Sequence, residues 1–554
     1  MTPAQLGAAV RAAVVAAVDA GELAVQPPQD VAIERPRSRD HGDYATNVAL
    51  QLAKAAGRPP REVAEIVATH LRGAAGVAAV DVAGPGFLNV RLADEAIGRV
   101  AVEVVTAGSG YGRGDAAAGQ AVNLEVVSAN PTGPIHIGGV RWAAVGDALA
   151  RLLEASGAGV TREYYVNDAG NQFHLFAASM LARARGRDVA DDGYAGDYVA
   201  EYAARIVADV PGLLDLDDDA ALAVFRARGL PLVVAEIRDA LDAFGVHFDV
   251  WFSELSLQTS GAVEQALKSL RAQGHVYDAD GAVWLRTTDF GDDKDRVLVK
   301  SDGASTYFMS DAAYYLDKRG RGFDRCIYML GADHHGYVGR LRAIAACAGD
   351  DPDSTLEVLI GQLVNVVKDG EVLRQSKRKG QYVSLQSLVG MIGADAARYL
   401  LARSSVDTTL DLDIDLATRR SSENPVFYVQ YAAVRAASVL RNAAEMGIAE
   451  PDPVSVDLSQ LQHERELDLL KALAEFPAVV ASAAQLREPH RVARYLEEQV
   501  ARSAQRFWDD CQVLPKGDEE VAPTTAPRLL LWRATRVVLE NGLRLLGVEA
   551  PVRM

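Results

Sequence analysis

The sequence predicts an α/β protein of three domains, in which a Rossmann-type parallel sheet lies between an N-terminal α/β domain and a C-terminal all-α helical bundle. Three observations support this fold. The 554 residues exceed one ordinary domain. Strand, turn and helix patterns recur in the middle of the chain, and only helical patterns follow residue 421. We expect domains at residues 1–110, 116–420 and 421–554, with insertions at about 185–260.

The composition indicates a globular, cytoplasmic protein. The formal charge of −18 argues against indiscriminate binding of nucleic acid, although it permits a local basic groove. Cys326, Cys347 and Cys511 lie far apart, so neither a disulfide framework nor a thiolate zinc site is indicated. No apolar run approaches the roughly 20 residues that cross a bilayer, and Arg11 and Asp19 interrupt the Ala/Val-rich N-terminus. We therefore expect no membrane association.

The N-terminal domain is predicted to alternate helices and short strands. The predicted elements are a first helix, a strand at 31–34, helices at 44–56 and 61–71, and strands near residue 80 and at 87–92. Arg35, Arg37 and Arg39 alternate along one segment, so an extended backbone would point them to one side. They could contact phosphates, or they could simply lie in a solvated loop. A Gly/Ala-rich linker, 108–119, ends the domain.

The first strand, turn and helix of the central domain form a candidate phosphate site. Residues 122–127 are predicted to be a buried strand, and the Pro/Gly-rich run 130–134 forces a turn before a helix. Gly138 and Gly139 let a ligand approach the backbone, where the helix offers unpaired N–H groups and a positive dipole end. His136 would lie beside the same phosphates.

Polar residues follow two further predicted strands. Strand 160–166 precedes Asn167, Asp168, Asn171 and Gln172, and strand 326–330 precedes the run 331–336, which contains Asp333, His334 and His335. The carboxyl ends of strands in a doubly wound sheet face one cleft. The alternative for either group is a helix cap. Adjacent histidines point apart on a helix, so a shared metal is not expected.

Between these strands the sequence gives fewer chemical signals. Residues 185–225 are predicted to be an irregular, acidic surface insertion, and helices resume near residue 230. Two β segments, 275–288 and 296–309, precede a helix at 311–318. The loop 374–380 holds four cations in six residues. Such loops are usually solvated charge, but this one could close over phosphates, where Lys377 would stabilise a leaving pyrophosphate.

Taken together, these motifs resemble a known family. His136-Ile137-Gly138-Gly139 and the 374–380 loop resemble the HIGH and KMSKS signatures of class I aminoacyl-tRNA synthetases. Longer strings are similar to the arginyl-tRNA synthetases of bacterial type, and they cover nearly the whole chain. They are ERPRSRDHGDYATNVALQLAK (34–54), SANPTGPIHIG (128–138), GADHHGY (331–337), ENPVFYVQYA (423–432) and the closing ATRVVLENGLRLLGVEAPVRM.

The resemblance implies a two-step reaction. ATP, with Mg²⁺ carried by its phosphates, and L-arginine would give arginyl-adenylate and pyrophosphate, and the arginyl group would pass to the terminal adenosine of tRNA(Arg). No tightly bound protein metal is implied, and the family expectation is a monomer. The implied catalytic residues are His136, Arg374 and Lys377, and the implied ATP-binding residues are His136, Gly138, Gly139, Asp333, His334, Ser376 and Lys377.

An arginine pocket needs acceptors, because the guanidinium group is a planar, always charged fork of donors. By resemblance, Glu254, Tyr307 and Asp311 would bind the guanidinium, while Asn130 and Gln172 would hold the backbone groups of the amino acid. Without the resemblance, ordinary roles are preferred for the first three. These are a charge at a strand end, a half-buried strand residue and a helix cap, respectively.

The chain departs from the family pattern at three positions. Gly139 stands where class I enzymes usually have histidine, so one nucleotide contact must come from the backbone or be lost. Arg374 replaces the first lysine of the second motif, which keeps charge but not shape. Ala433 replaces the histidine of a common YAHAR string, so no role of that histidine is carried over. A compensating lysine of some relatives is absent here, where Gly133 stands, and Lys377 is present.

The resemblance also assigns tRNA contacts to both outer domains. The N-terminal domain would contact the tRNA elbow, with Arg35 and Arg37 as candidates. The helical domain would read the anticodon, with Tyr428, Gln430, Tyr431 and Arg435 as candidates for stacking and phosphate contact. The two tyrosines could equally be core residues.

Rival functions fit less well. A cysteinyl enzyme would want a thiolate zinc site, a simple nucleotidyl transferase would not need the helical domain, and a non-catalytic binding protein would not need both His136 and Lys377.

Overall fold

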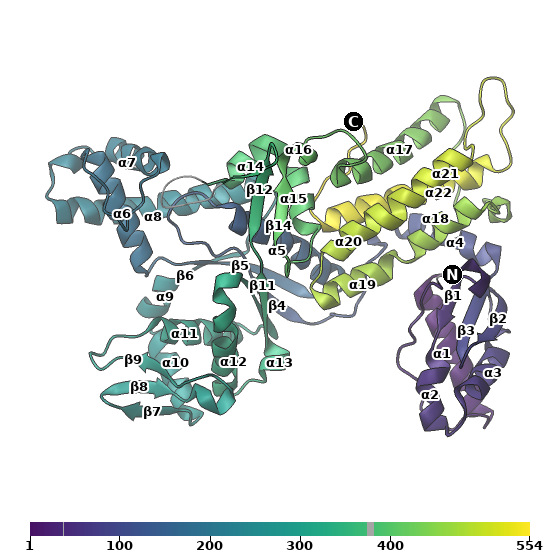
Figure 1. Cartoon of the computed structure of the whole chain (residues 1–554), viewed down its shortest axis with the longest axis horizontal. Helices are drawn as coiled ribbons and strands as arrows, with labels where there is room; N and C mark the ends of the chain where they lie inside the picture. The colour runs from purple at the N-terminus through teal and green to yellow at the C-terminus, as the bar shows by residue number, and fades with distance from the viewer. Residues whose placement is uncertain (37, 374–381) are drawn as a thin grey trace.

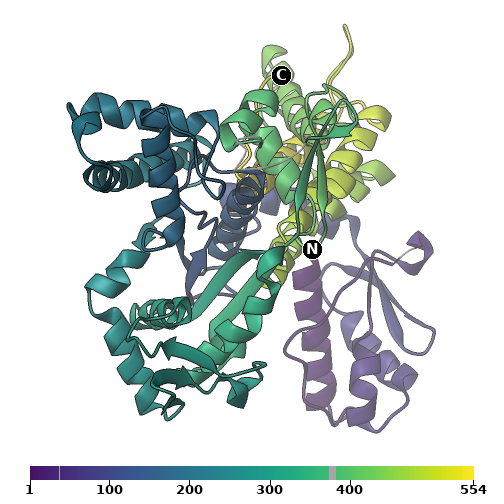
Figure 2. The ribbon, with the colours of Figure 1, turned by 60° about the vertical axis from the view of Figure 1, so that its left-hand side comes forward.

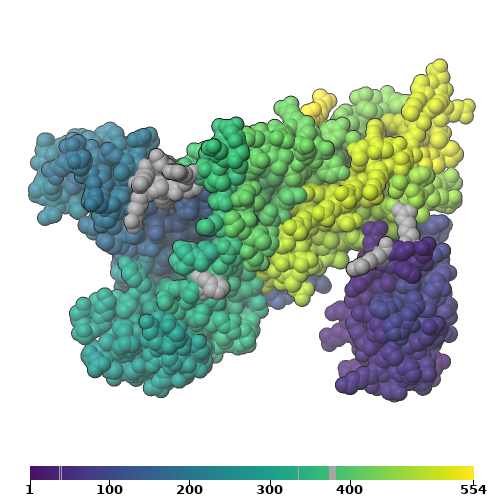
Figure 3. Space-filling model, in the orientation of Figure 1, coloured from purple at the N-terminus to yellow at the C-terminus, as the bar shows by residue number. Residues whose placement is uncertain are grey.

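The computed structural model describes residues 1–36, 38–373 and 382–554, and it divides into three parts (Figure 1). The N-terminal domain and the lobe around β7–β9 form two separate masses, and the central and helical domains lie above them (Figures 1 and 3). Within the described ranges no helix is both long enough and apolar enough to cross a membrane. The predicted fold class is confirmed.

The central domain is built on a parallel sheet with the order β11-β10-β4-β5-β6. Its strands are β4 (Ala121–Glu125), β5 (Gly159–Val166), β6 (Val250–Ser253), β10 (Arg325–Gly331) and β11 (Leu356–Gly361). Chain order reverses between β4 and β10. Ligands of such sheets bind beyond the carboxyl ends of the strands at this reversal, so the fold itself places a site there.

Helix α5 (Ile137–Ala155) packs unusually close to this sheet because small residues face it. A Cβ added to Gly146 would lie 2.4 Å from the side chain of Val126, and one added to Gly361 would lie 2.3 Å from the Trp142 ring. Arg141, also on α5, is buried and donates to the carbonyls of Gln362, Thr408 and Ser405. These contacts fix the start of α5 relative to the strand ends.

The N-terminal domain differs from the prediction at its start. The segment 31–34 forms only an isolated bridge from Glu34 to Ala45, and the strand lies instead at Tyr44–Thr46. The predicted helix from residue 44 therefore begins at Val48. Its elements are α1 (Pro3–Asp19), β1 (Tyr44–Thr46), α2 (Val48–Ala56), α3 (Pro60–Leu71), β2 (Val77–Ala83), β3 (Phe87–Leu92) and α4 (Asp94–Ala107), with the antiparallel sheet order β1-β3-β2.

The insertion is helical, contrary to the prediction of an irregular segment at 185–225. It contains α6 (Asn171–Ala184), α7 (Asp197–Asp209) and α8 (Asp218–Ala243), which form a lobe of their own at one end of the molecule (Figure 1). Asp217 caps α8 by accepting from the Ala220 N–H at 2.8 Å, and Asp218 and Asp219 occupy its first turn. The acidic run was thus a helix start, favoured by the helix dipole.

The lobe between β6 and β10 also corrects one prediction. Strand β9 spans only Arg296–Val299, and the remainder of the predicted strand 296–309 contains the start of a helix at Tyr307, because Thr306 accepts from the Met309 N–H. The elements are α9 (Glu254–Thr259), α10 (Ala262–Ala272), β7 (Val276–Ala279), β8 (Ala282–Leu285), β9, α11 (Tyr307–Gly320), α12 (Val338–Cys347) and α13 (Pro352–Thr355), with the sheet order β7-β8-β9. Figure 2 shows this lobe apart from the N-terminal domain.

The last part of the central domain leads into the helical domain. It contains β12 (Val364–Lys368), β13 (Glu371–Val372), α14 (Leu385–Ile392), α15 (Ala394–Ala402), β14 (Leu410–Asp413) and α16 (Ile414–Ala417). The predicted helix at 385–401 is broken at Gly393, whose φ is +82°. The helical domain contains α17 (Pro425–Glu445), α18 (Glu464–Ala474), α19 (Phe476–Leu486), α20 (His490–Tyr495), a π-helical segment (Leu496–Ala501), α21 (Arg502–Asp510) and α22 (Thr525–Leu545).

The N-terminal domain rests on the helical domain through specific polar contacts. Asp43 pairs with Lys471, and Arg35 Nε lies 3.2 Å from Glu475 Oε1. The Tyr111 hydroxyl donates to the Leu473 carbonyl at 3.0 Å. The two outer domains, distant in sequence, therefore contact each other directly.

Candidate functional site

The turn before α5 is organised around His136. Its Nδ1 accepts from the Gly138 N–H at 3.2 Å, so the imidazole caps the first turn of α5. The neighbouring Ile135 carbonyl accepts from the Leu385 N–H at 2.9 Å, and His136 forms an isolated bridge to Ser384. The chain that follows residues 374–381 is thereby held against the turn.

Gly138 and Gly139 each lack room for a side chain, but for different structural reasons. A Cβ on Gly138 would lie 3.0 Å from the His136 ring, so glycine lets that ring fold over the helix start. A Cβ on Gly139 would lie 2.7 Å from the Ile135 side chain. Because Gly139 is buried against Ile135, a histidine could not fit there without a rearrangement. The departure from the HIGH pattern is thus accommodated by local packing.

The loop that joins β4 to this turn is strained and firmly anchored. Val127 and Ser128 have φ values of 68° and 42°, and a positive φ is a strong outlier for a β-branched residue. The Tyr164 hydroxyl donates to the Ala129 carbonyl at 2.9 Å, and the Ser128 hydroxyl accepts from the Tyr165 N–H at 3.1 Å. Two contacts from β5 thus support the strained backbone, which leads to the exposed Asn130.

Acidic side chains gather around Tyr165 at the carboxyl ends of β5 and β6, and we call this cluster the acidic pocket. Burial and the charges of Glu254 and Asp311 raise the pKa of this phenol, with smaller effects of Glu125 and Asp168. Asp168 accepts from the Ser253 hydroxyl at 2.6 Å and from the Leu255 N–H at 2.8 Å, so it acts as a helix cap and a brace between strands. Sequence reasoning missed Tyr165, although its place two residues before Asn167 was a usable signal.

Glu254 is buried without a full set of partners. It is 3% exposed, and its Oε2 has no hydrogen-bond partner in the described part of the chain. Burial and the charge of Asp168 raise its pKa, while a hydrogen bond from Tyr165 opposes the shift. A buried carboxylate of this kind is costly unless a cation binds it.

Asp311 lies in the same pocket on the first turns of α11. Burial and the charges of Glu254 and Glu125 raise the pKa of its carboxyl to about 8, and the charge of Arg340 opposes this. The Tyr337 hydroxyl donates to Asp311 Oδ2. Across residues 1–36, 38–373 and 382–554, neither Asp311 nor Glu254 forms an ion pair. The acidic side chains of the pocket therefore lack a cationic partner.

Tyr307 is 68% exposed and precedes Asp311 by one turn of α11. The spacing of four residues places both side chains on one face of the helix. Tyr307 is therefore at the rim of the pocket and not in its floor, and it is a helical residue, contrary to the strand predicted there.

A second set of charges beneath the pocket is fully paired. Lys318 is 0% exposed, lies 2.7 Å from Glu125 Oε2, and sits over the Tyr314 and Tyr328 rings. Arg321 and the Tyr314 hydroxyl both donate to Glu163. Burial alone would raise the pKa of Glu163, but the hydrogen bond from Arg321 and the charge of Lys318 lower it.

The remaining predicted residues of the cleft are placed at its margins. Gln172, on the first turn of α6, accepts from the Tyr194 hydroxyl at 2.7 Å. Asp333 and His334 lie on an exposed 3₁₀ turn (Ala332–Tyr337) that follows β10. The distance from His334 Nε2 to Asp333 Oδ2 is 3.5 Å. The same end of the sheet thus carries the turn of His136, the acidic pocket and these polar groups. Arg374, Ser376, Lys377 and Arg37 lie outside the described residues.

The helical domain presents an aromatic and cationic face on α17 and α21. Tyr431 is 44% exposed and stacks on Phe427, and the guanidinium of Arg435 lies 4.9 Å from the Tyr431 ring and 5.3 Å from the Trp508 ring. Tyr428 is partly buried against the core. Phe427 and Trp508 were missed, although the former stands within the quoted string at 423–432.

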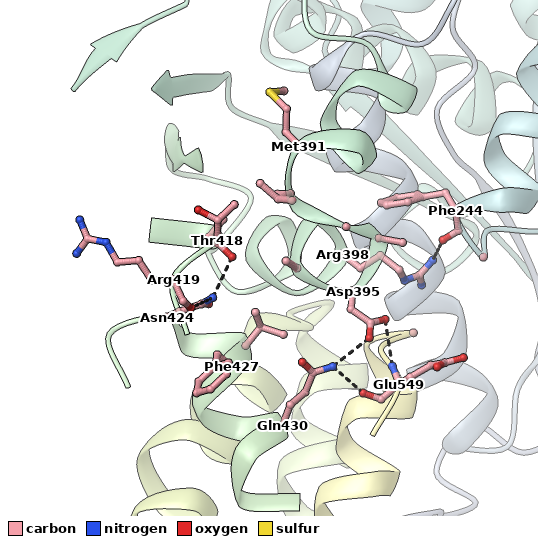
Figure 4. A pocket seen from close by; sticks show the side chains of 18 of the residues that line it. Phe244, Met391, Asp395, Arg398, Thr418, Arg419, Asn424, Phe427, Gln430 and Glu549 are labelled. Atoms are coloured by element: carbon pink, nitrogen blue, oxygen red, sulfur yellow. Dashed lines mark hydrogen bonds between the residues drawn. The ribbon is translucent and has the colours of Figure 1, made fainter. Parts of the chain in front are cut away.

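Two residues predicted to contact tRNA also have partners within the protein. Gln430 is 9% exposed, and its amide donates to Asp395 at 3.0 Å and to the Glu549 carbonyl at 2.9 Å (Figure 4). It holds α15 and the C-terminus together and lines a cavity of about 700 Å³. Arg35 pairs with Glu475 at the domain junction.

Comparisons with known proteins agree on one family. The chain matches the family models "Arginyl tRNA synthetase N terminal domain" at residues 4–92, "tRNA synthetases class I (R), catalytic domain" at 103–197 and 223–416, and "DALR anticodon binding domain" at 429–554. It is 60% identical over 554 residues to an arginine–tRNA ligase of Frankia alni, and 59% identical over 557 residues to one of Kineococcus radiotolerans; both pairs are covered completely.

A solved structure supports the fold. The arginyl-tRNA synthetase of Thermus thermophilus superposes with a TM-score of 0.77 at 23% identity, and 100% of each chain is covered.

Proposed function

The chain belongs to the arginyl-tRNA synthetase family and ligates arginine to tRNA(Arg) with ATP, and we propose that it does so with the acidic pocket and the His136 turn. The observation that supports the proposal is a pair of carboxyl groups without a cationic partner, the buried Glu254 and the partly buried Asp311, at the same end of the sheet as the His136 turn. A guanidinium group is the fixed, planar cation that would satisfy both.

In the proposed binding mode, the guanidinium of arginine lies between Glu254 and Asp311, with Tyr165 behind it and Tyr307 at the rim. Lysine lacks the planar fork and would leave buried acceptors unpaired, which is the kind of polar mismatch that gives strong discrimination. Asn130 and Gln172, which follow the strand ends β4 and β5, would hold the backbone groups of the amino acid.

The nucleotide would occupy the His136 turn, as MgATP. The backbone at Gly138 and Gly139 and the dipole of α5 would bind its phosphates, and Asp333 and His334 would contact the nucleoside part. An arginine carboxylate oxygen would then attack the α-phosphorus, and the bond to the pyrophosphate oxygen would break. Lys377, Arg374 and Ser376 would assist pyrophosphate departure, a role that rests on their sequence positions alone.

Transfer completes the reaction. An oxygen of a terminal adenosine hydroxyl attacks the carbonyl carbon of arginyl-adenylate, and AMP leaves with the electrons of the broken bond. Because both steps require aligned reactants more than covalent help from the protein, positioning and charge stabilisation are the main contributions expected of these residues.

We also propose the finer features of the enzyme. Its domains would span 1–110, 116–420 and 421–554. Tyr431 and Arg435, with Phe427 and Trp508, would contact the anticodon by stacking and by phosphate contact. Three buried, free thiols suit a reducing cytoplasm, and a monomer is expected.

The test is ATP–pyrophosphate exchange with each amino acid, with and without tRNA(Arg). We expect exchange with arginine and tRNA together, and little with lysine or without tRNA. Exchange with another amino acid, and none with arginine, would overturn the proposal.

A further inference from the structure

The insertion contacts the candidate site through a cluster of four tyrosines and one phenylalanine. The cluster joins the loop before α7, α7 itself and the segment that follows residue 381; its members are Phe176, Tyr194, Tyr198, Tyr202 and Tyr382. Figure 1 shows α6, α7 and α8 together as one lobe beside the central sheet. The lobe is therefore not a passive surface addition, since Tyr194 contacts the predicted site residue Gln172 and Tyr198 packs against Gly133 in the turn before α5.

Tyr194 fixes the amide of Gln172. Its hydroxyl donates to Gln172 Oε1 at 2.7 Å, and Tyr194 itself is 5% exposed. The Ser179 hydroxyl accepts from the Tyr194 N–H at 3.0 Å, and the ring packs edge-on against Phe176. Both the backbone and the ring of Tyr194 are thus held, so its hydroxyl has a defined direction.

This contact decides which hydrogen bonds Gln172 can offer. A glutamine amide has one accepting oxygen and one donating NH₂ group. Because the Tyr194 hydroxyl is the donor to the oxygen, the NH₂ group is the part left to act on a ligand. Such a donor suits the carboxylate of an amino acid and not its ammonium group.

Tyr198 supports the other side of the site. Gly133, in the turn before α5, has a φ of +117°, and a Cβ there would lie 2.4 Å from the Tyr198 ring. The same ring packs edge-on against Tyr382, at 6.1 Å between centroids. One ring of α7 thus backs the phosphate turn and the segment leading to Ser384, which pairs with His136.

We propose that the insertion is a positioning element of the active site, in which Tyr194 sets Gln172 as a hydrogen-bond donor to the arginine carboxylate and Tyr198 holds the phosphate turn. The inference rests on the proposed function. It gives residues 185–225 a role that their composition did not suggest.

The experiment is a double-mutant cycle of Tyr194→Phe and Gln172→Ala, read by exchange kinetics with saturating tRNA(Arg). Each single variant is expected to raise the KM for arginine about five-fold, the effect of one lost hydrogen bond, with kcat and the KM for ATP unchanged. The double variant should equal the single ones. Tyr202→Phe is the matched control, since its ring lies in the same cluster and contacts Phe176 but not Gln172.

Two further variants test whether Gln172 acts as a hydrogen-bond donor and whether Tyr198 supports the turn before α5. Gln172→Glu keeps the shape but loses the donor, so it should raise the KM for arginine more than Gln172→Ala does. Tyr198→Leu should raise the KM for ATP more than that for arginine. The inference is overturned if Tyr194→Phe matches Tyr202→Phe, if the cycle is additive, or if Gln172→Glu behaves as wild type. Failure of the wild type to exchange with arginine would instead refute the proposed function.

Discussion

Two sets of carboxyl groups lie at one end of the central sheet, and they differ in their partners. Glu125 and Glu163 are neutralised by Lys318 and Arg321, whereas Glu254 and Asp311 have only phenolic hydroxyls and distant charge. Removing one partner of a buried ion pair is strongly destabilising, so the first set belongs to the fold. The second set keeps a raised pKa because burial and neighbouring like charges act on it without a cationic partner, as expected of the proposed arginine site. The two sets contain the same residue types and differ in whether a cation pairs with them.

The largest expected effect is a loss of stability when the cation of the paired set is removed. Lys318→Met leaves Glu125 buried without its cation, which should cost about 3–5 kcal/mol of unfolding free energy. Urea denaturation followed by tryptophan fluorescence measures this. Arg205→Met is the matched control, because Arg205 pairs with Glu236 at the surface and should matter by less than about 1 kcal/mol. Equal stability of the two variants would show that Lys318 is not structural.

The next effect concerns the unpaired set. Glu254→Gln should raise the KM for arginine at least about 30-fold, because loss of one member of a buried charge pair costs about 2 kcal/mol or more. The KM for ATP should stay within about two-fold, and the exposed Glu264→Gln should change neither constant. A similar rise in both Michaelis constants would place Glu254 outside the arginine pocket. Stability should not fall as it does in Lys318→Met.

A smaller effect follows from protonation. The pKa of Asp311 is raised to about 8, so its carboxyl is mostly neutral below that pH, and in the proposed binding mode arginine binds the ionised form. The KM for arginine should therefore fall as pH rises from about 6.5 to 8.5, by at most about ten-fold per pH unit. The KM for ATP, measured over the same range, is the reference. A flat arginine profile would mean that Asp311 is ionised before the substrate arrives.

The same shift has a consequence for stability. Because the folded state holds this proton more tightly than the unfolded chain, stability should decrease as pH rises through the window between the ordinary value of 3.8 and about 8. Asp311→Asn should lessen that decrease, measured by urea denaturation over the same pH range, while Glu254, whose pKa is also raised, keeps its own contribution.

The sequence predicted most of the fold because its signals were local. Hydrophobic strands, glycine-rich turns and amphipathic helices identified the parallel sheet, the turn at His136 and the helical domain. The prediction was wrong where a local pattern was compatible with two structures. The acidic residues 217–219 read as surface charge but begin α8, and Tyr307 read as a strand residue although Thr306 caps a helix there.

The site was predicted less completely, because the sequence does not show which side chains become hydrogen-bond or ion-pair partners. Glu254 and Asp311 were named by resemblance, but that they lack cationic partners is visible only in three dimensions. Gln430 sits in a motif suited to nucleic acid, yet Asp395 and Glu549, from distant parts of the chain, bind its amide. Likewise, the contacts of Tyr194 and Tyr198 join segments that no periodicity connects.

The most direct test of the account compares arginine with citrulline, which has the same shape but an uncharged end group. Exchange kinetics with saturating tRNA(Arg) give kcat/KM for both amino acids in the wild type and in Asp311→Asn. If unneutralised carboxylates select the substrate, the wild type should favour arginine by several orders of magnitude, and Asp311→Asn should lower kcat/KM for arginine but not for citrulline. Equal losses for both amino acids would contradict the central claim.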